Sequence, residues 1–265
     1  MIERVLPEPV ATAEVFGDVD GAGLFPAERA LVARAVRSRQ REFATGRYCA
    51  RRALAGLGLP ARPLLWGTKG APLWPEAVRG SITHCAGYRA AAVVHLSRMA
   101  SVGIDAEPHH PLPEGVLGAV ARPAEEARIA QLALREPEVH WGRLLFSAKE
   151  SVYKAWYPLT GLPLRFGQVR VDWFPDRQEF TAHVAPVPDA STRDGGPAPR
   201  ELSGRWLVER GIVVTAVTVP GQRGPVPGGP ARQSYLPGLL EREGRRHGGS
   251  PDAPPSGVSD ACRSE

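Results

Sequence analysis

Residues 143–157 read RLLFSAKESVYKAWY. At about 100° per residue, the apolar positions of this segment fall on one side of a helix and predict a buried stripe. These positions are Leu145, Val152, Trp156 and Leu159. Glu150 and Lys154 leave the opposite side four residues apart. On a solvated face that spacing gives an ordinary ion pair worth about 0.3–0.5 kcal/mol.

Aromatic residues share the face that carries Glu150 and Lys154, and they argue against a solvated surface. On the helical wheel Phe146, Tyr153 and Tyr157 lie within about 60° of Glu150. A carboxylate and an ammonium group among aromatic rings require partners or a ligand, because burying an unpaired charge is costly. The segment is therefore either a simple ion pair or half of a functional site.

The pattern around this helix predicts an α+β fold in two lobes, because helix, strands, helix and strands follow one another along the chain. The hairpins are bounded by Pro, Asp and Gly residues that are typical of turns. The expected elements are a helical region from Pro26 to Gly56 or Gly58, broken at most once, strands at 81–96 and 101–107, a short helix from Pro123, and hairpins at 165–185 and 204–219 that turn near Asp176 and Gly211.

Composition is typical of a soluble globular protein. The chain has 265 residues, of which 43% are hydrophobic and 23% charged, and no apolar run approaches the ~20 residues of a membrane helix. The N-terminus carries acids and lacks the apolar segment of a signal peptide, so a cytoplasmic location is expected. A net charge of +5 favours anionic partners. The 3 cysteines have no C-x-x-C spacing, which argues against a disulfide framework or a cysteine zinc site.

Two segments lack any sustained period. Residues 221–265 consist mainly of Gly, Pro, Ser and charged residues and predict a disordered tail. Residues 186–204 have a similar composition between two strand-like runs and predict a long loop.

Two acids stand at strand spacing in VGIDAEPHH. Asp105 and Glu107 point to the same face of a strand that ends at Pro108. At ~4 Å and an effective dielectric constant of ~20, their repulsion would be about 4 kcal/mol. A solvated strand end would avoid that cost, and a divalent cation such as Mg²⁺, which takes one or two carboxylates together with substrate phosphates, would remove it.

Basic residues could receive an anionic ligand elsewhere in the chain. In REFATGRYCARRALAGLG, Arg47 lies on the apolar stripe and Arg51 at its margin. They either cover apolar surface with their stems or bind a phosphate through the guanidinium fork. Weaker candidates, each explicable by structure alone, come from GTKGAP and SITHC and are Lys69, Gly70, Ser81, Thr83 and His84.

In this order, SITHC, VGIDAE and FSAKESVYKAW resemble the signature set of the 4′-phosphopantetheinyl transferases. The likeness is to the larger monomeric branch that includes the surfactin- and enterobactin-type enzymes, and it is closest to actinobacterial members. It covers nearly the whole folded part, because EFATGRYCARRALAGLG, WGTKGAPLWP and WLVERGIVVTAV also look like family blocks. The joint occurrence of the acidic motif and the helical motif is more specific than either motif alone.

The resemblance implies two pseudo-symmetric lobes, each a small antiparallel sheet with a long helix, and CoA bound between them. We expect an N-terminal lobe at 1–103, a C-terminal lobe at 104–220 and the tail at 221–265. The implied reaction moves the phosphopantetheine arm of CoA onto a serine of an apo carrier protein and releases 3′,5′-ADP. The implied partners are CoA and acidic carrier proteins, with no nucleic acid and no membrane, and the enzyme is expected to be a monomer.

The resemblance also assigns roles to individual residues. It implies that Mg²⁺, or Mn²⁺ in its place, is held by three acids, which are Asp105, Glu107 and Glu150. Glu150 is also the implied general base, although a metal-bound water could serve instead, and Lys154 neutralises the leaving phosphate. The implied CoA contacts are Arg47, Arg51, Lys69, Gly70, Ser81, Thr83, His84, Lys149 and Lys154.

Two departures from the family pattern stand within these motifs. Phe146 occupies a position where many members have Trp, and Ala106 provides no ligand where some relatives place an acid. A non-catalytic CoA-binding regulator on the same fold remains an alternative, although Glu150 and Lys154 argue against it. A nucleic-acid-binding protein is supported only by the positive charge.

Overall fold

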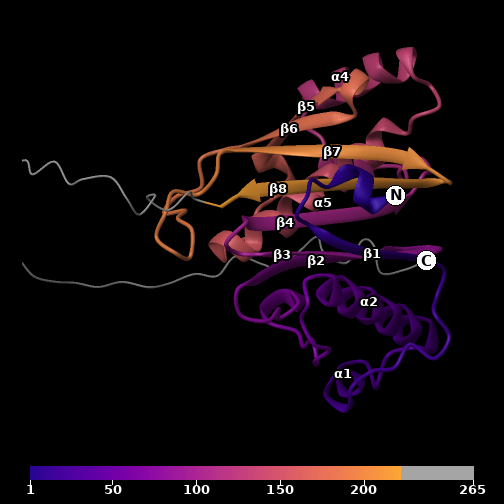
Figure 1. Ribbon diagram of the computed structural model, residues 1–265. Coiled ribbons are helices and arrows are strands. Elements are labelled where there is room, and N and C mark those ends of the chain that lie inside the picture. The colour runs from indigo at the N-terminus through magenta and orange to yellow at the C-terminus, as the bar shows by residue number, and fades with distance from the viewer. Residues whose placement is uncertain (222–265) are drawn as a thin grey trace, which may run out of the picture. The chain divides into compact units, whose positions relative to one another are not determined.

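The computed structural model describes residues 1–221, and the predicted tail lies outside the described residues apart from Gly221. The α+β class is confirmed, since two antiparallel sheets and several helices alternate along the chain (Figure 1). The helices are η1 (Ile2–Val5), α1 (Pro26–Leu31), α2 (Arg37–Gly56), η2 (Thr68–Gly70), α3 (Val116–Val120), α4 (Pro123–Arg135), α5 (Trp141–Thr160), η3 (Phe166–Gln168) and η4 (Pro175–Arg177). No described helix is long and apolar enough to cross a membrane.

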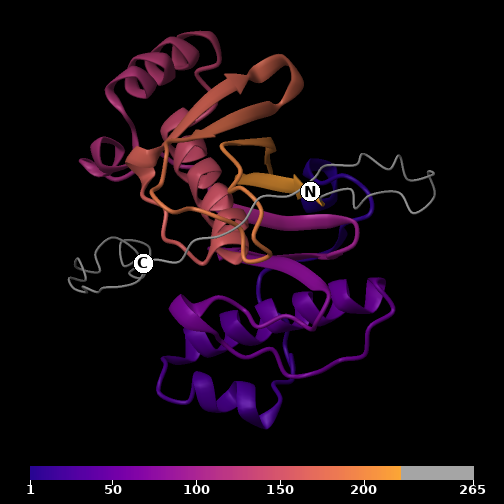
Figure 2. The ribbon, with the colours of Figure 1, turned by 90° about the vertical axis from the view of Figure 1, so that its left-hand side faces the viewer.

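The first sheet has three strands in the order β1-β3-β2. They are β1 (Ala11–Phe16), β2 (Val78–Cys85) and β3 (Tyr88–His95). Helix α2 packs against this sheet through small and apolar residues, including Cys49, Ala50 and Leu54, which meet Val78 and Val93. The predicted helical region therefore divides once, into α1 and α2, and only α2 is long enough to cover the sheet (Figures 1 and 2).

The second sheet has five strands in the order β4-β8-β7-β6-β5. They are β4 (Met99–Pro108), β5 (Val169–Phe174), β6 (Glu179–Val184), β7 (Glu201–Glu209) and β8 (Ile212–Pro220). Both hairpins form as predicted, and Arg210 and Gly211 turn with positive φ between β7 and β8. The core between this sheet and α5 includes three tryptophans in edge-to-face contact, Trp141, Trp173 and Trp206.

The two sheets meet where β2 lies beside β4, and side-chain hydroxyls join them. The Thr83 hydroxyl accepts the Ala106 N–H at 2.9 Å, and the Ser81 hydroxyl accepts the Ile104 N–H at 3.1 Å. These bonds satisfy backbone donors that would otherwise be buried without a partner. A shared apolar core reinforces the contact, because it contains residues of η1, β3, β4 and β8.

The predicted boundary between lobes needs adjustment. β4 begins at Met99, so a division between residues 103 and 104 would cut this strand in two. The N-terminal residues Ile2 and Val5 pack in the shared core with Ile104 and Val214. Residues 1–221 therefore belong to one unit, in which the two sheets do not have separate cores throughout.

Helix α5 lies directly on β4 at Gly103. A Cβ atom at this position would lie 2.1 Å from the Ser151 carbonyl oxygen and 2.5 Å from the Ala155 nitrogen. Only a residue without a side chain allows this approach, which brings the acids of VGIDAE against the helix of the opening motif.

The predicted loop between β6 and β7 is irregular, as expected, and it packs against the second sheet and α5. The Arg193 N–H donates to the Leu159 carbonyl at 2.7 Å, and a single β-bridge joins Ser191 and Pro197.

Candidate active site

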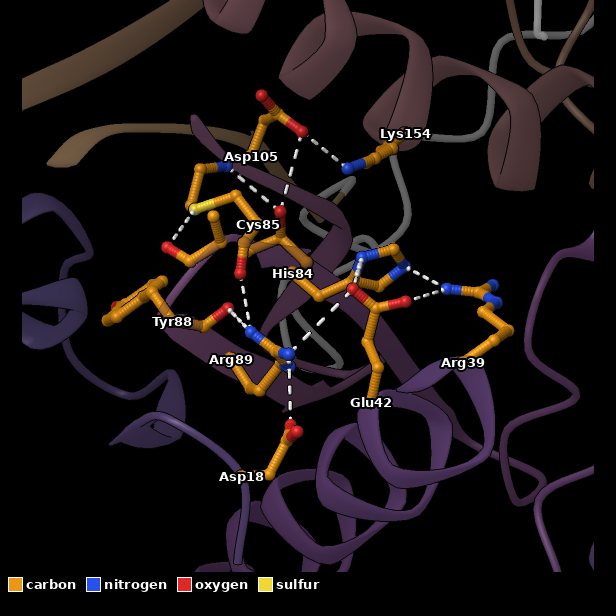
Figure 3. A network of polar contacts seen from close by, with 12 residues as sticks. Asp18, Arg39, Glu42, His84, Cys85, Tyr88, Arg89, Asp105 and Lys154 are labelled. Atoms are coloured by element: carbon orange, nitrogen blue, oxygen red, sulfur yellow. Dashed lines mark hydrogen bonds and ion pairs between the residues drawn. The ribbon is translucent and has the colours of Figure 1, made fainter. Parts of the chain in front are cut away.

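The centre of the site is an ion pair between β4 and α5. The Lys154 ammonium lies 2.6 Å from Oδ1 of Asp105, which is 4% exposed (Figure 3). Oδ2 of Asp105 is buried without a hydrogen-bond partner in the described part of the chain. Burial lowers the Lys154 pKa, but the charges of Asp105 and Glu150 outweigh burial and raise it overall. Lys154 therefore remains a cation, and it pairs with Asp105 rather than with Glu150.

The carboxyl group of Glu150 has a pKa well above the usual value for a glutamate. Burial, opposed by the Lys154 charge and assisted by that of Asp105, raises the pKa of Glu150 to about 7. A carboxyl group with this pKa exchanges protons readily near pH 7, which suits a general base. Of the three aromatic residues predicted on this face, Tyr153 and Tyr157 stack at 5.8 Å between ring centroids, whereas Phe146 packs against Phe166.

Glu107, the second acid of β4, faces Arg143 in the first turn of α5. The guanidinium lies 3.0 Å from Oε2 of Glu107. Burial and the charge of Asp105 raise the pKa of Glu107 to about 7, against the lowering effect of Arg143. The two acids of this strand therefore oppose each other electrostatically, as the sequence predicted.

Asp105 and Glu107 fit a hard divalent cation by their chemistry. Both supply carboxylate oxygens, one Asp105 oxygen is buried without a partner, and their mutual repulsion would be relieved by added positive charge. In residues 1–221, however, no three His, Cys, Asp or Glu side chains are grouped closely enough to hold a metal ion. The predicted set of three carboxylates is thus not preformed, and only the pair on β4 fits this role directly.

His84 joins the site from the first sheet through a polar cluster on α2 (Figure 3). Its Nδ1 lies 3.0 Å from Glu42, and its Nε2 lies 3.0 Å from Arg39. Burial raises the pKa of Glu42, but His84 and Arg39 together lower it to about 2. Arg39 was not predicted from the sequence, although its position on the same helix as Arg47 and three residues before Glu42 was a usable signal.

Ser81 and Thr83 are not exposed to a phosphate in this structure. Their side chains are 3% and 1% exposed and bond to β4, so their hydroxyls are occupied by the contact between the sheets. The phosphate contact of these two residues stays a prediction. Thr83 nevertheless touches the site, since its hydroxyl lies 3.4 Å from Oδ1 of Asp105.

The two arginines of α2 differ from each other. Arg51 pairs at 3.0 Å with Glu28, which is fully buried, and this internal partner contradicts its predicted role at a phosphate. Arg47 points inward as predicted, lies 4.3 Å above the Phe43 ring, and donates to the Leu64 carbonyl at 2.9 Å. Its Nη2 is buried without a partner among the described residues, and burial lowers its pKa to about 10.

Lys69 and Gly70 lie in the exposed turn of η2, both with positive φ. Trp66, three residues earlier, packs edge-on against Phe43 at 5.2 Å, so the turn is on the Arg47 side of α2. Lys69 and Gly70 therefore stay predicted contacts for a ligand that binds beside the first sheet.

Lys149 is the clearest correction. Its side chain is fully buried and donates to Glu125 at 2.7 Å, to the Val120 carbonyl at 2.8 Å and to the Phe166 carbonyl at 3.2 Å. It therefore connects α5 to α3, α4 and η3 and does not face the acids of β4. The sequence placed it beside Glu150 but could not supply Glu125 as its partner.

Comparison with known proteins identifies the family. Residues 27–94 match the 4′-phosphopantetheinyl transferase N-terminal domain, and residues 101–194 match the 4′-phosphopantetheinyl transferase superfamily. A protein of Streptomyces mobaraensis named 4′-phosphopantetheinyl transferase Svp is 51% identical over 230 residues, which are 84% of this chain and 91% of the relative. The chain belongs to the 4′-phosphopantetheinyl transferase superfamily.

The resemblance to actinobacterial enzymes is confirmed, and a less similar relative is an enterobactin synthase component. The 4′-phosphopantetheinyl transferase PptT of Mycobacterium tuberculosis is 45% identical over 225 residues, 83% of this chain and 98% of the relative. Enterobactin synthase component D of Salmonella typhimurium is 34% identical over 185 residues, 69% of this chain and 73% of the relative. The gap between the two family matches, after residue 94 and before residue 101, contains the start of β4.

Proposed function

We propose that this chain transfers the phosphopantetheine arm of CoA to a serine hydroxyl of an apo carrier protein and releases 3′,5′-ADP. Family membership supports the reaction class, and three relatives are named 4′-phosphopantetheinyl transferases. The observation that carries the proposal is the pairing of Lys154 with Asp105 next to a Glu150 of raised pKa. This arrangement provides a cation for phosphate charge and a base for a hydroxyl.

In the proposed reaction the serine oxygen forms a bond to the phosphorus that carries the pantetheine arm. The bond from that phosphorus to the oxygen of 3′,5′-ADP breaks, and Glu150 accepts the serine proton. Lys154 neutralises the charge that develops on the departing phosphate. Glu150 thus contributes general-base catalysis, and Lys154 contributes electrostatic stabilisation of the phosphoryl transfer.

Asp105 and Glu107 are the residues that would hold Mg²⁺, or Mn²⁺ in its place. When bound, the ion would supply charge neutralisation at the CoA pyrophosphate. Glu150 could join them only after a change in this arrangement, because no group of three acids is gathered in the described residues. Outside such a group, Glu150 would accept the serine proton without also serving as a metal ligand.

The CoA-binding residues in this proposal are Arg47, Lys69, Gly70, His84 and Lys154. We add Arg39 because it contacts His84. Arg47 carries an unpaired buried nitrogen that an anionic ligand could satisfy. A net charge of +5 favours docking of a carrier protein with an acidic surface.

The test is incubation of the purified protein with CoA, Mg²⁺ and a panel of apo carrier proteins from fatty-acid, polyketide and nonribosomal-peptide systems, followed by mass spectrometry. We expect at least one carrier to gain the mass of one phosphopantetheine, with 3′,5′-ADP formed in equal amount. CoA binding without any mass gain across the panel would instead support a non-catalytic regulator.

A further inference from the structure

Three charged side chains follow one line along α5. Glu150 and Lys154 come seven and eleven residues after Arg143, so at 100° per residue each lies within about 20° of Arg143 on the helical wheel. β4 packs against this line of side chains, and each of its two acids pairs with one of the two cations on the line. Arg143 meets Glu107, and Lys154 meets Asp105. Glu150 lies between two matched cation–carboxylate bridges.

The Arg143 guanidinium donates hydrogen bonds to more than one partner. Nη1 donates to Oε2 of Glu107 at 3.0 Å, Nε to the His110 carbonyl at 3.2 Å and Nη2 to the Pro111 carbonyl at 3.0 Å. The planar fork thus connects an acid on β4 with the chain that leaves this strand. A lysine could supply the charge at this place but could not supply three donors in fixed directions.

The environment of this pair distinguishes it from a surface salt bridge. The side chains of Arg143 and Glu107 are 14% and 9% exposed, so solvent screens their interaction only in part. Surface pairs in the same chain, such as Arg170 with Asp172, are more than 40% exposed and are expected to contribute little. Removing Arg143 would leave the Glu107 carboxylate beside the like charge of Asp105 with less compensating positive charge.

We propose that Arg143 is a positioning residue for the active site, which holds the Glu107 carboxylate in the orientation required of a ligand for the divalent cation. This inference rests on the proposed function, in which Asp105 and Glu107 hold that cation. Arg143 itself contacts neither the cation nor CoA in this scheme. Its role is that of an outer partner that fixes a ligand by hydrogen bonding, and loss of such partners usually weakens metal binding about 10- to 100-fold.

The experiment measures Mn²⁺ binding by electron paramagnetic resonance in the presence of saturating CoA, without a carrier protein, so that no turnover is involved. Arg143→Met removes the donors and preserves most of the side-chain length, and Arg143→Lys retains only the charge. We expect at least about tenfold weaker Mn²⁺ binding for Arg143→Met and an intermediate value for Arg143→Lys. Arg4→Met, which removes a guanidinium paired with Glu209 outside the site, should bind Mn²⁺ like the unaltered protein.

A double-mutant cycle tests whether Arg143 acts through Glu107. In a Glu107→Gln background, Arg143→Met should cause little further loss of Mn²⁺ affinity, whereas a full additional loss would overturn the proposal. If Arg143→Met fails to fold, the same cycle with Arg143→Lys provides the comparison.

The outcomes separate this inference from the proposed function. If the unaltered protein binds Mn²⁺ and Arg143→Met binds it equally well, the role of Arg143 is refuted and the metal site stands. If the unaltered protein with CoA binds no Mn²⁺, or if Asp105→Ala binds it unchanged, the metal site itself is refuted and the role of Arg143 fails with it.

Discussion

Lys149 and Lys154 stand five residues apart on one helix, yet their surroundings differ completely. Lys149 is fully buried, and its three N–H donors are used by Glu125 and two backbone carbonyls. Lys154 is 28% exposed at its side chain and has one carboxylate partner, Asp105. A cation whose donors are all satisfied by the protein is part of the architecture, whereas one that retains donors beside a buried acid can still bind a substrate.

The strongest test of this contrast is Glu150→Gln on the Lys154 side of α5. We expect transfer to a carrier protein to fall at least about 1000-fold, because the amide cannot accept the serine proton. The unfolding midpoint should not fall, since the substitution retains the shape of the side chain and removes a charge that burial disfavours. Transfer would be followed by mass spectrometry, with Glu126→Gln, an exposed position on α4, as the matched control. Undiminished transfer would remove Glu150 as the base.

Lys149→Met should have the opposite profile. Removal of one partner from a buried ion pair leaves Glu125 charged and without its cation, which costs about 3–5 kcal/mol of folding free energy. Urea unfolding would measure this loss. At a temperature where the variant remains folded, it should still transfer phosphopantetheine, whereas Lys154→Met should not. A Lys149→Met protein of normal stability without activity would return Lys149 to the phosphate, as the sequence had suggested.

Gly103→Ala tests whether the site around Lys154 and Asp105 depends on the close approach of β4 to α5. The new Cβ would meet backbone atoms of Ser151 and Ala155, which cannot move independently of the helix. We expect a destabilisation of about 3 kcal/mol and reduced transfer, because the two elements carry opposite halves of the site. Gly118→Ala is the control, since nothing lies within 4 Å of its added Cβ. Equal stability of the two variants would contradict the packing described here.

The smallest predicted effect is the pH dependence of folding stability that arises from two acids, Glu42 and Glu150. The pKa of Glu42 is lowered to about 2 from a usual value of 4.5, so its stabilising contribution is present above pH 4.5 and is lost as the pH falls toward 2. Its magnitude is on the order of 2 kcal/mol after allowance for partial solvent screening. Glu150, with its pKa raised to about 7, should behave oppositely and favour folding as the pH falls from 7 to 4.5.

Urea unfolding at several pH values in the presence of a chelator would measure both contributions. Glu42→Gln should be less stable than the parent at pH 6 and approach it at pH 2.5, where the parent has lost most of the benefit. A constant difference between the two proteins at all these pH values would rule out the Glu42 contribution.

Local pattern was sufficient for much of the fold. The periodicity of α5, the turn residues of both hairpins and the strand spacing of Asp105 and Glu107 all predicted elements that the structure contains. Each depends on residues close together in sequence. The same spacing also places Arg143, the first residue of the segment 143–157, on the face that carries Glu150 and Lys154.

The errors concern residues whose partners are distant in sequence. Lys149 and Arg51 looked available for a phosphate, but each has a buried acid supplied by another helix, Glu125 and Glu28 respectively. Ser81 and Thr83 were assigned to a phosphate because their hydroxyls suit one, and their bonds to β4 could not be read from the sequence. No local pattern distinguishes a hydroxyl that binds a ligand from one that joins two sheets.

The Thr83 hydroxyl gives the contact between the sheets a thermodynamic consequence. It bonds to the Ala106 backbone and also lies 3.4 Å from Asp105, so one group serves both the joint between β2 and β4 and the acid that pairs with Lys154. Any ligand that alters the bonding of Asp105 therefore also alters the strength of the joint. By reciprocity, the packing of one sheet against the other sets part of the affinity for that ligand.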